Sequence, residues 1–217
     1  MKINVVIPAG GTSSRFGKKN KLLEKIDGKM VIEYTVEAFE DERISEIIIP
    51  ANVSIIELLE ETFKNNPKIK IIEGGKARQQ SVFNGLNYSE CDYVLIHDGA
   101  RPMITKELVS LAIDMVIDKK ALTVATKTVD TIKEVVEGKI VKTIDRAKLY
   151  NTQTPQAFEY NLILNAHKKL VDENYTDDAG MLESLGKTVY ILDGSYKNIK
   201  ITTQNDLDIA KIYLKQN

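Results

Sequence analysis

A run of small and basic residues follows the first apolar segment of the chain. The apolar residues 5–7 are typical of a buried strand. Behind them come the glycines Gly10 and Gly11, three hydroxyl residues at 12–14, and the cations Arg15 and Lys21, which we predict to bind a ligand. Backbone donors in a tight turn, together with cations, form an anion site, and phosphate is the common anion. An ordinary strand-to-helix turn with a solvated basic run behind it would look similar.

The spacing of this segment excludes two well-known phosphate loops. A P-loop requires G-x-x-x-x-G-K-[ST]. Counted from Gly11, the second glycine comes one residue late at Gly17, and Lys18 is followed by Lys19. A dinucleotide fingerprint requires G-x-G-x-x-G, and neither Gly10 nor Gly11 begins one. A phosphate site here would therefore belong to another class of loop.

A second flexible turn, residues 74–81, follows a later apolar run. It begins with Gly74 and Gly75 and ends with Ser81. Its backbone groups are suited to reading the edge of a nucleobase, with the Ser81 hydroxyl assisting. An ordinary strand-to-helix loop is the alternative, because the pattern alone is weak.

An acidic residue follows the apolar run 93–96. Asp98 would lie at the carboxyl end of a parallel strand, where a carboxylate suits a ribose hydroxyl or a hydrated Mg²⁺. Arg101 would either pair with Asp98 at the site or bind a phosphate. An Asp98–Arg101 ion pair with a purely structural role is an equal alternative to a binding role for these residues. His97 is more typical of a core or turn histidine than of a catalyst.

Several polar groups stand at the edges of other apolar runs. Taken singly, each is more typical of a protein surface than of a site. They are residues 130–133, 145–146, 152–156, 176–178 and 198–202.

Composition limits the class of protein. A chain of 217 residues suits one α/β domain or two small ones. The net charge of −1 gives no indication of nucleic-acid binding. The single cysteine excludes an intrachain disulfide and a cysteine-rich metal site. Because the sequence shows neither a signal peptide nor an apolar segment of transmembrane length, we expect a soluble cytoplasmic protein without a membrane partner.

Strand-like and helix-like segments alternate along most of the chain. Strands are predicted at 3–7, 46–49, 70–72, 93–96, 122–125 and 189–192. Helices are predicted at 31–39, 55–63, 79–86, 106–117, 161–170 and 204–214, with Thr105 as an N-cap. The alternation predicts a single α/β domain over 1–217, with a Rossmann-like, mostly parallel sheet flanked by helices. Ligands of such sheets bind beyond the carboxyl ends of the strands, where the loop 9–17 would lie.

One segment departs from this alternation. Polar and apolar residues roughly alternate on both sides of Glu137-Gly138-Lys139, which predicts a β-hairpin within 131–145. An isolated hairpin is marginal in water, so it should pack against something. The pattern leaves open whether a second subunit or its own domain provides that surface.

Eight short motifs together carry a family resemblance. They are A-G-G-x-x-S-R at 9–15, G-G-x-x-R-x-x-S-V at 74–82, H-D-G-A-R-P at 97–102, D-T-I-K at 130–133, D-R at 145–146, Q-T-P-Q at 153–156, T-D-D at 176–178 and N-I-K-I-T at 198–202. In this order they cover nearly the whole chain, which resembles the sugar-phosphate cytidylyltransferases of the isoprenoid pathway. The departures are Asn20 and Leu22 beside Lys21, where the family usually has Pro and Gln.

The resemblance implies a reaction. CTP and 2-C-methyl-D-erythritol 4-phosphate would give 4-diphosphocytidyl-2-C-methyl-D-erythritol and pyrophosphate, with Mg²⁺ or another divalent cation. The segment Pro8-Ala9-Gly10-Gly11 also resembles ribitol-5-phosphate cytidylyltransferases, so ribitol 5-phosphate is an alternative acceptor. A non-catalytic nucleotide-binding protein is a further alternative, whereas the missing G-x-G-x-x-G counts against a dehydrogenase.

The resemblance also assigns roles to individual residues. Arg15 and Lys21 would stabilise the transition state, and Arg146 and Lys200 would bind the acceptor phosphate. Nucleotide binding is implied for Ala9, Gly10, Gly11, Gly75, Ser81, Asp98 and Gly99, with Asp98 also a possible metal ligand. Further substrate contacts are implied for Arg101, Thr131, Thr154 and Thr176. The hairpin arm at about 131–150 would reach into the neighbouring site of a homodimer.

Overall fold

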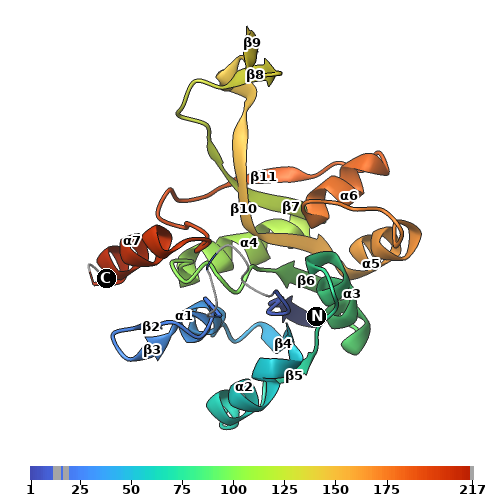
Figure 1. Cartoon of the computed structure of the whole chain (residues 1–217). Helices are drawn as coiled ribbons and strands as arrows, with labels where there is room; N and C mark the ends of the chain where they lie inside the picture. Colours follow the sequence, from blue (N-terminus) through green and yellow to red (C-terminus); the bar gives the residue numbers. More distant parts are fainter. Residues whose placement is uncertain (12–15, 17–19, 216–217) are drawn as a thin grey trace.

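A central β-sheet runs through the body of the computed structural model, which describes residues 1–11, 16 and 20–215 (Figure 1). In the described part of the chain this sheet has seven strands in the order β11-β7-β10-β6-β1-β4-β5. Their bounds are β1 Ile3–Val6, β4 Ile44–Ala51, β5 Ile69–Glu73, β6 Tyr93–Ile96, β7 Ala121–Lys127, β10 Tyr150–Glu159 and β11 Tyr190–Asp193. A small two-stranded sheet, β2 Lys25–Ile26 and β3 Lys29–Met30, precedes the first helix.

The sheet is mostly parallel, as predicted, but one strand runs the other way. β1 pairs in parallel with β4 and β6, β4 with β5, and β7 with β11. β10 is antiparallel to both β6 and β7. This strand was not predicted from the sequence, because its polar residues at 152–156 suggested the edge of an apolar run. The sheet is therefore mixed.

Helices cover both faces of the sheet (Figure 1). Their bounds are α1 Val31–Glu37, α2 Ile56–Phe63, α3 Arg78–Tyr88, α4 Lys106–Lys119, α5 Tyr160–Lys169, α6 Asp178–Ser184 and α7 Gln204–Leu214. The predicted N-cap is confirmed, since the Thr105 hydroxyl accepts a hydrogen bond from Leu108 N at 3.3 Å. Helix α6 was not predicted. Asp177 caps it by accepting from Gly180 N.

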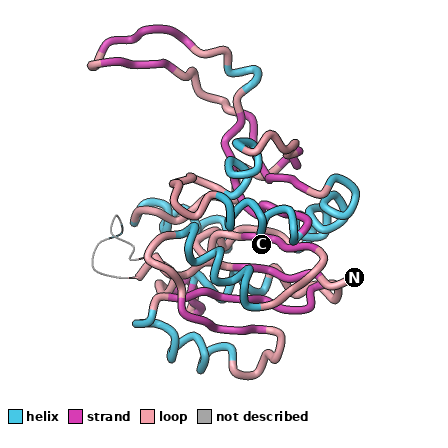
Figure 2. Tube along the Cα trace, turned by 90° about the vertical axis from the view of Figure 1, so that its right-hand side faces the viewer, coloured by secondary structure: helices cyan, strands magenta, loops and turns pink. Residues whose placement is uncertain are grey.

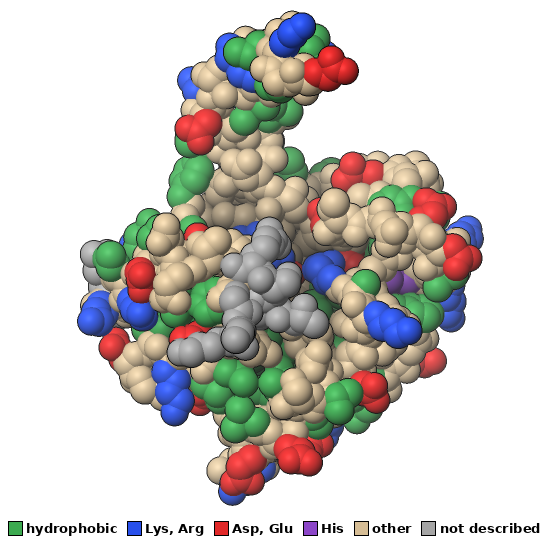
Figure 3. All heavy atoms as spheres, in the orientation of Figure 1, with side chains coloured by type: hydrophobic (Ala, Val, Ile, Leu, Met, Phe, Trp, Pro, Cys, Tyr) green, Lys and Arg blue, Asp and Glu red, His purple; other side chains and the backbone are tan. Residues whose placement is uncertain are grey.

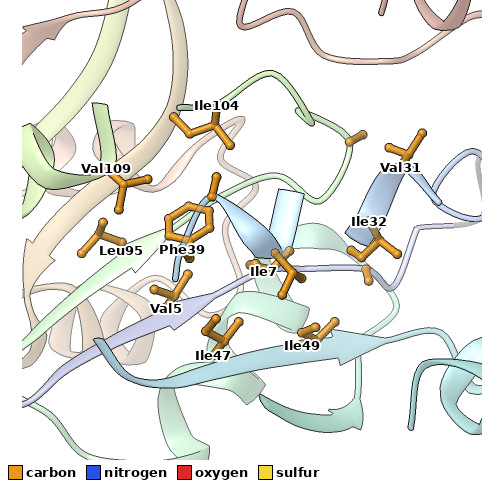
Figure 4. Close-up of a cluster of buried hydrophobic side chains, with 14 of the residues drawn as sticks. Val5, Ile7, Val31, Ile32, Phe39, Ile47, Ile49, Leu95, Ile104 and Val109 are labelled. Atoms are coloured by element: carbon orange, nitrogen blue, oxygen red, sulfur yellow. The ribbon is translucent and has the colours of Figure 1, made fainter. Parts of the chain in front are cut away.

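Alternate side chains of β1 contribute to two hydrophobic clusters, one on each face of the sheet. Val5, with Ile7 just beyond the end of β1, belongs to the larger cluster, together with side chains from α1, α2, α4 and α7. Figure 4 shows Val5 and Ile7 beside Phe39 and Ile47 in this cluster. Val6 faces the second cluster, which α3, α5 and α6 complete. This double cover explains why the central strands are mostly apolar.

The predicted hairpin is confirmed, with β8 Lys133–Val136 antiparallel to β9 Lys139–Thr143. Glu137 and Gly138 both have positive φ, 48° and 78°, as expected for a tight hairpin turn. Extensions of β7 and β10 carry the hairpin away from the body (Figures 1 and 2). The alternative that it folds back on its own domain is therefore wrong. We call residues 131–150 the arm.

Candidate active site

A cavity of about 290 Å³ opens at the carboxyl edge of the sheet, beyond the ends of β1 and β6. Four described segments line it: the turn after β1, the region around Lys21, the start of α3 and the loop after β6. Lys200 and Thr202, just before α7, complete the described lining. This is the position at which open α/β sheets bind ligands.

Most of the predicted ligand-binding residues meet in this cavity. Those that line it are Ala9, Gly10, Gly11, Lys21, Ser81, Asp98, Gly99 and Lys200. Gly75, Arg101 and Thr154 lie beside these residues without lining the cavity. Arg15 lies outside the described residues.

The two glycine turns lie against each other at the cavity wall. A Cβ added to Gly10 would come within 2.7 Å of the Ser81 hydroxyl oxygen and 3.3 Å of the Gly75 carbonyl. Ser81 is buried, and its hydroxyl accepts from Gly75 N at 2.9 Å while lying 3.1 Å from the Ala77 carbonyl. Gly10 is therefore required by close packing, and Ser81 holds the second turn in shape.

Asp98 is the charged centre of the cavity. Its carboxylate lies 3.0 Å from Arg78 Nε and 2.7 Å from Lys200 Nζ. Arg101 Nε is 3.7 Å away, and the same guanidinium donates to the Asn198 carbonyl. Burial alone would raise the pKa of this carboxyl, but the three surrounding cations outweigh burial and hold the pKa well below its usual range. Asp98 is thus a permanent acceptor.

A buried hydrogen-bond chain supports Asp98 from behind. Asp98 N donates to the Thr154 hydroxyl at 3.1 Å, and that hydroxyl lies 3.1 Å from His97 Nδ1. His97 Nε2 lies 3.2 Å from the Arg101 carbonyl. Burial lowers the pKa of His97 to about 3, so the ring is neutral. The consistent assignment is that Thr154 donates to Nδ1 and that Nε2–H donates to the carbonyl.

This hydrogen-bond chain bears on one prediction about the loop after β6. The prediction of a structural His97 is confirmed, since its side chain is fully buried. Thr154 reaches the loop because the pairing of β10 with β7 is interrupted between Thr152 and Gln156. Such irregularities re-aim side chains towards a site.

Four residues that were given no role from the sequence form a polar network that runs from the cavity wall into the protein interior. Arg78 joins Asp98 to Asp178, His167 lies against Asp178, and Gln156 accepts from Asp178 N. Three of them stand inside the quoted motifs, at the arginine of 74–82, the last residue of 153–156 and the last residue of 176–178. His167 carries no motif signal, because on the sequence it is one polar residue of an amphipathic helix.

The remaining predicted residues lie elsewhere in the described chain. Thr131 and Arg146 are exposed on the arm, where Arg146 Nη1 donates to the Val129 carbonyl. Thr176 is exposed in the loop before α6. None of the three lines the cavity of its own chain.

The described residues do not provide a metal cage. No group of three or more His, Cys, Asp or Glu side chains among them is placed to hold a metal ion. Asp98 is the only carboxylate among the described lining residues, and Arg78 and Lys200 already engage its two oxygens. This donor set does not fit a Mg²⁺ ion held by the protein itself.

In the described part of the chain, no helix is both long and apolar enough to span a membrane.

The fold and the cavity together define an α/β protein with a ligand site at the carboxyl edge of its sheet, where cations line a cavity suited to an anion. Comparison with known proteins makes this specific. The family model for 2-C-methyl-D-erythritol 4-phosphate cytidylyltransferase matches residues 3–216. The enzyme of that name from Caldanaerobacter subterraneus subsp. tengcongensis is 42% identical over 228 aligned residues, covering 100% of both chains.

Other relatives agree. The corresponding enzyme of Clostridioides difficile is 40% identical, covering 96% of this chain and 92% of its own. The crystal structure of 4-diphosphocytidyl-2C-methyl-D-erythritol synthase from Anaerococcus prevotii has a TM-score of 0.88 at 30% identity, covering 98% of this chain and 96% of that one. The chain belongs to the 2-C-methyl-D-erythritol 4-phosphate cytidylyltransferase family. It is a nucleotidyltransferase of the isoprenoid pathway, as the motifs predicted, and neither the ribitol nor the non-catalytic alternative is favoured.

Proposed function

We propose that this chain transfers the cytidylyl group of CTP to 2-C-methyl-D-erythritol 4-phosphate, with the cavity beyond β1 and β6 as its active site. An oxygen of the acceptor phosphate forms a bond to the α-phosphorus of CTP. The bond from that phosphorus to the bridging oxygen breaks, and pyrophosphate leaves. The observation that carries the proposal is the cationic cavity, which Lys21 and Lys200 line together with the glycine turn after β1.

The nucleophile is already an anion, so the reaction needs no strong general base. The difficulty is the negative charge gathered around one phosphorus, and catalysis is therefore positioning and electrostatic stabilisation. In this proposal Lys21 and Arg15 stabilise the transition state and the leaving pyrophosphate. Lys200 binds the acceptor phosphate together with Arg146.

The nucleoside part of CTP lies against the two glycine turns. Backbone groups of Gly75 and the turn that Ser81 holds read cytosine, and Asp98 and Gly99 hold the ribose. Because Asp98 stays ionised, it is suited to accept hydrogen bonds from ribose hydroxyls. Thr154 and Arg101 act indirectly, through the loop that carries Asp98, and Thr176 stays a proposed substrate contact.

A divalent cation, Mg²⁺ by preference, would enter with the triphosphate. Its ligands would be mainly phosphate oxygens and water, as is usual for Mg²⁺ at nucleotide sites. We also propose a cytoplasmic location for the enzyme.

The arm is proposed to dimerise two copies of this chain. Its exposed apolar side chains include Val135, Val136, Ile140 and Val141, which are 52–66% exposed, and Figure 3 shows apolar side chains on the projecting arm. A second copy would cover them and would bring Arg146 and Thr131 of each arm to the cavity of the other subunit.

Mixing two impaired variants, assayed with the acceptor well below its KM, tests this arrangement. Lys21→Ala removes a cation of the cavity, and Arg146→Ala removes one from the arm. If the arm serves the partner's cavity, a mixed dimer has one intact site, and random mixing restores about a quarter of the wild-type activity. Activity no higher than that of the separate variants, with dimers present, would show that the arm does not act across subunits.

The reaction itself is tested by pyrophosphate release from CTP and Mg²⁺, with 2-C-methyl-D-erythritol 4-phosphate and ribitol 5-phosphate supplied in parallel. Release with the first acceptor alone is expected. Release with ribitol 5-phosphate alone would contradict the proposed acceptor while keeping the mechanism, and release with neither would contradict the activity.

A further inference from the structure

Arg78 connects the cavity to the protein interior. Its Nε donates to Asp98 at 3.0 Å, and its Nη1 donates to Asp178 at 2.8 Å. The Arg78 side chain is 27% exposed, whereas that of Asp178 is 1% exposed. A guanidinium is planar and rigid, so the carboxylate at one edge determines the direction of the donors at the other.

His167 fixes the inner carboxylate. Its Nε2 lies 3.0 Å from Asp178 Oδ1, and both side chains are buried. The imidazole stacks on Phe83, with ring centroids 6.0 Å apart and planes at 8°. Its Nδ1 has no hydrogen-bond partner among the described residues. The bond to Asp178 is thus the polar contact that orients this ring.

The backbone of Asp178 is fixed as well. Gln156 Oε1 accepts from Asp178 N at 2.9 Å and from Ala179 N at 3.1 Å. Gln156 lies on β10, two residues beyond Thr154, whose hydroxyl accepts from Asp98 N. One strand therefore holds the backbones of both carboxylates that Arg78 joins.

We propose that His167 and Asp178 are positioning residues for the nucleotide: they orient Arg78, which holds the Asp98 carboxylate in the direction that accepts a ribose hydroxyl. The role rests on the proposed contact between Asp98 and ribose. The other close cation, Lys200, is a single ammonium on a flexible stem that is 35% exposed, so it supplies charge without direction.

The charge state of the inner pair supports this role. Burial alone would raise the pKa of Asp178, but the charge of Arg78 and the hydrogen bond from His167 outweigh it, so the pKa is lowered. Asp178 is therefore ionised at neutral pH. A neutral amide at this position would keep the shape but would lose the charge that holds the guanidinium.

The test measures selectivity for ribose. Values of kcat/KM are determined for CTP, 2′-deoxy-CTP and 3′-deoxy-CTP with the wild type, Asp178→Asn, His167→Leu and His167→Gln. Asp98→Asn gives the full effect of losing the proposed ribose contact. Tyr160→Phe is the matched control. Tyr160 lies on the same helix, α5, and its hydroxyl donates a buried hydrogen bond to the Leu86 carbonyl at 2.8 Å, outside the network.

We expect Asp178→Asn to lower kcat/KM for CTP roughly tenfold or more, as for loss of a charged hydrogen bond. The kcat/KM for the deoxy analogue that the wild type discriminates against should change far less. The selectivity ratio, which is kcat/KM for CTP divided by kcat/KM for that analogue, should therefore fall towards the ratio of Asp98→Asn. His167→Leu should reduce the ratio in the same direction, and His167→Gln, which keeps a donor, should restore it. Tyr160→Phe should leave the ratio unchanged.

Two results would overturn the proposal in distinguishable ways. If the wild type and Asp98→Asn treat CTP and both deoxy analogues alike, the proposed contact between Asp98 and ribose fails, and the positioning role fails with it. If Asp98 reads ribose but the His167 variants keep the wild-type ratio, the positioning role alone is wrong. The two His167 variants decide the matter even where Asp178→Asn does not fold.

Discussion

Replacing Thr154 by valine removes the central hydroxyl of the chain behind Asp98 while keeping the shape of the side chain. Two buried groups lose their partner: the Asp98 N–H, which donates to this hydroxyl, and His97 Nδ1, which lies 3.1 Å from it. Thr154 itself is 4% exposed, so water does not readily replace the hydroxyl.

Each buried group left unpaired costs about 1–3 kcal/mol. Because valine fills the same space and two groups are left unpaired, we expect Thr154→Val to lower the free energy of unfolding by roughly 2–6 kcal/mol. Thr154→Ser keeps the hydroxyl and loses one methyl group, which costs about 1 kcal/mol. The difference between the two variants therefore isolates the hydroxyl.

Urea unfolding followed by far-UV circular dichroism measures both variants, and it suits a chain that contains no tryptophan. The KM for CTP measured in parallel should rise in Thr154→Val, because the loop that carries Asp98 loses its support. A valine variant no less stable than the serine variant would refute the assignment of Thr154 as the link between His97 and Asp98.

Three further predictions concern the cavity, the arm and pH. Lys21→Ala should lower kcat roughly 100-fold or more, which is the scale of losing a transition-state donor. Lys25 is exposed on β2, so Lys25→Ala is the control and should keep kcat. Equal activities of the two variants would exclude the role of Lys21. Arg146→Ala should raise the KM for the acceptor roughly tenfold or more, and a defect confined to the KM for CTP would contradict this. Because burial lowers the pKa of His97 to about 3, against about 6.5 when unfolded, the unfolded state binds more protons between these values. Unfolding free energies should therefore fall by up to about 1.4 kcal/mol per pH unit on acidification from pH 6.5 to 4.5, and less in His97→Gln; identical slopes would refute this reading.

The elements that the sequence predicted well are those whose pattern reflects burial. Strand β6 is a continuous apolar run, and β1 is apolar apart from the buried Asn4, because helices cover both faces of the sheet. The arm was predicted for the opposite reason, since a glycine turn between alternating residues is a local signal that does not depend on packing.

The missed elements depend on contacts that are distant in sequence. In β10 the buried Gln156 pairs with Thr123 and with the start of α6, so a strand of polar appearance is satisfied only once those partners are in place. Helix α6 has seven residues and contains Gly180, which leaves little local periodicity. The network of Arg78, Asp178 and His167 could not be predicted for the same reason, because its residues meet only when α3, α5 and α6 pack together.

The pKa values of Asp98 and His97 determine whether either group contributes to the pH dependence of the rate. The pKa of Asp98 is shifted down by the cations around it, and burial lowers the pKa of His97 to about 3. Both pKa values are therefore shifted further below neutral pH, so neither group changes charge between pH 6 and 9. His97 also lies behind Asp98 and does not line the cavity.

The acceptor, in contrast, is a phosphate monoester, whose second pKa is about 6. If its dianion is the nucleophile, kcat/KM for the acceptor should rise through about pH 6 and stay level to about pH 8. Replacing the acceptor phosphate by a phosphonate, which ionises at higher pH, should move the rise upward by the same amount. A rise that stays in place with the phosphonate would assign the titration to the protein and would contradict a mechanism that relies on positioning and charge alone.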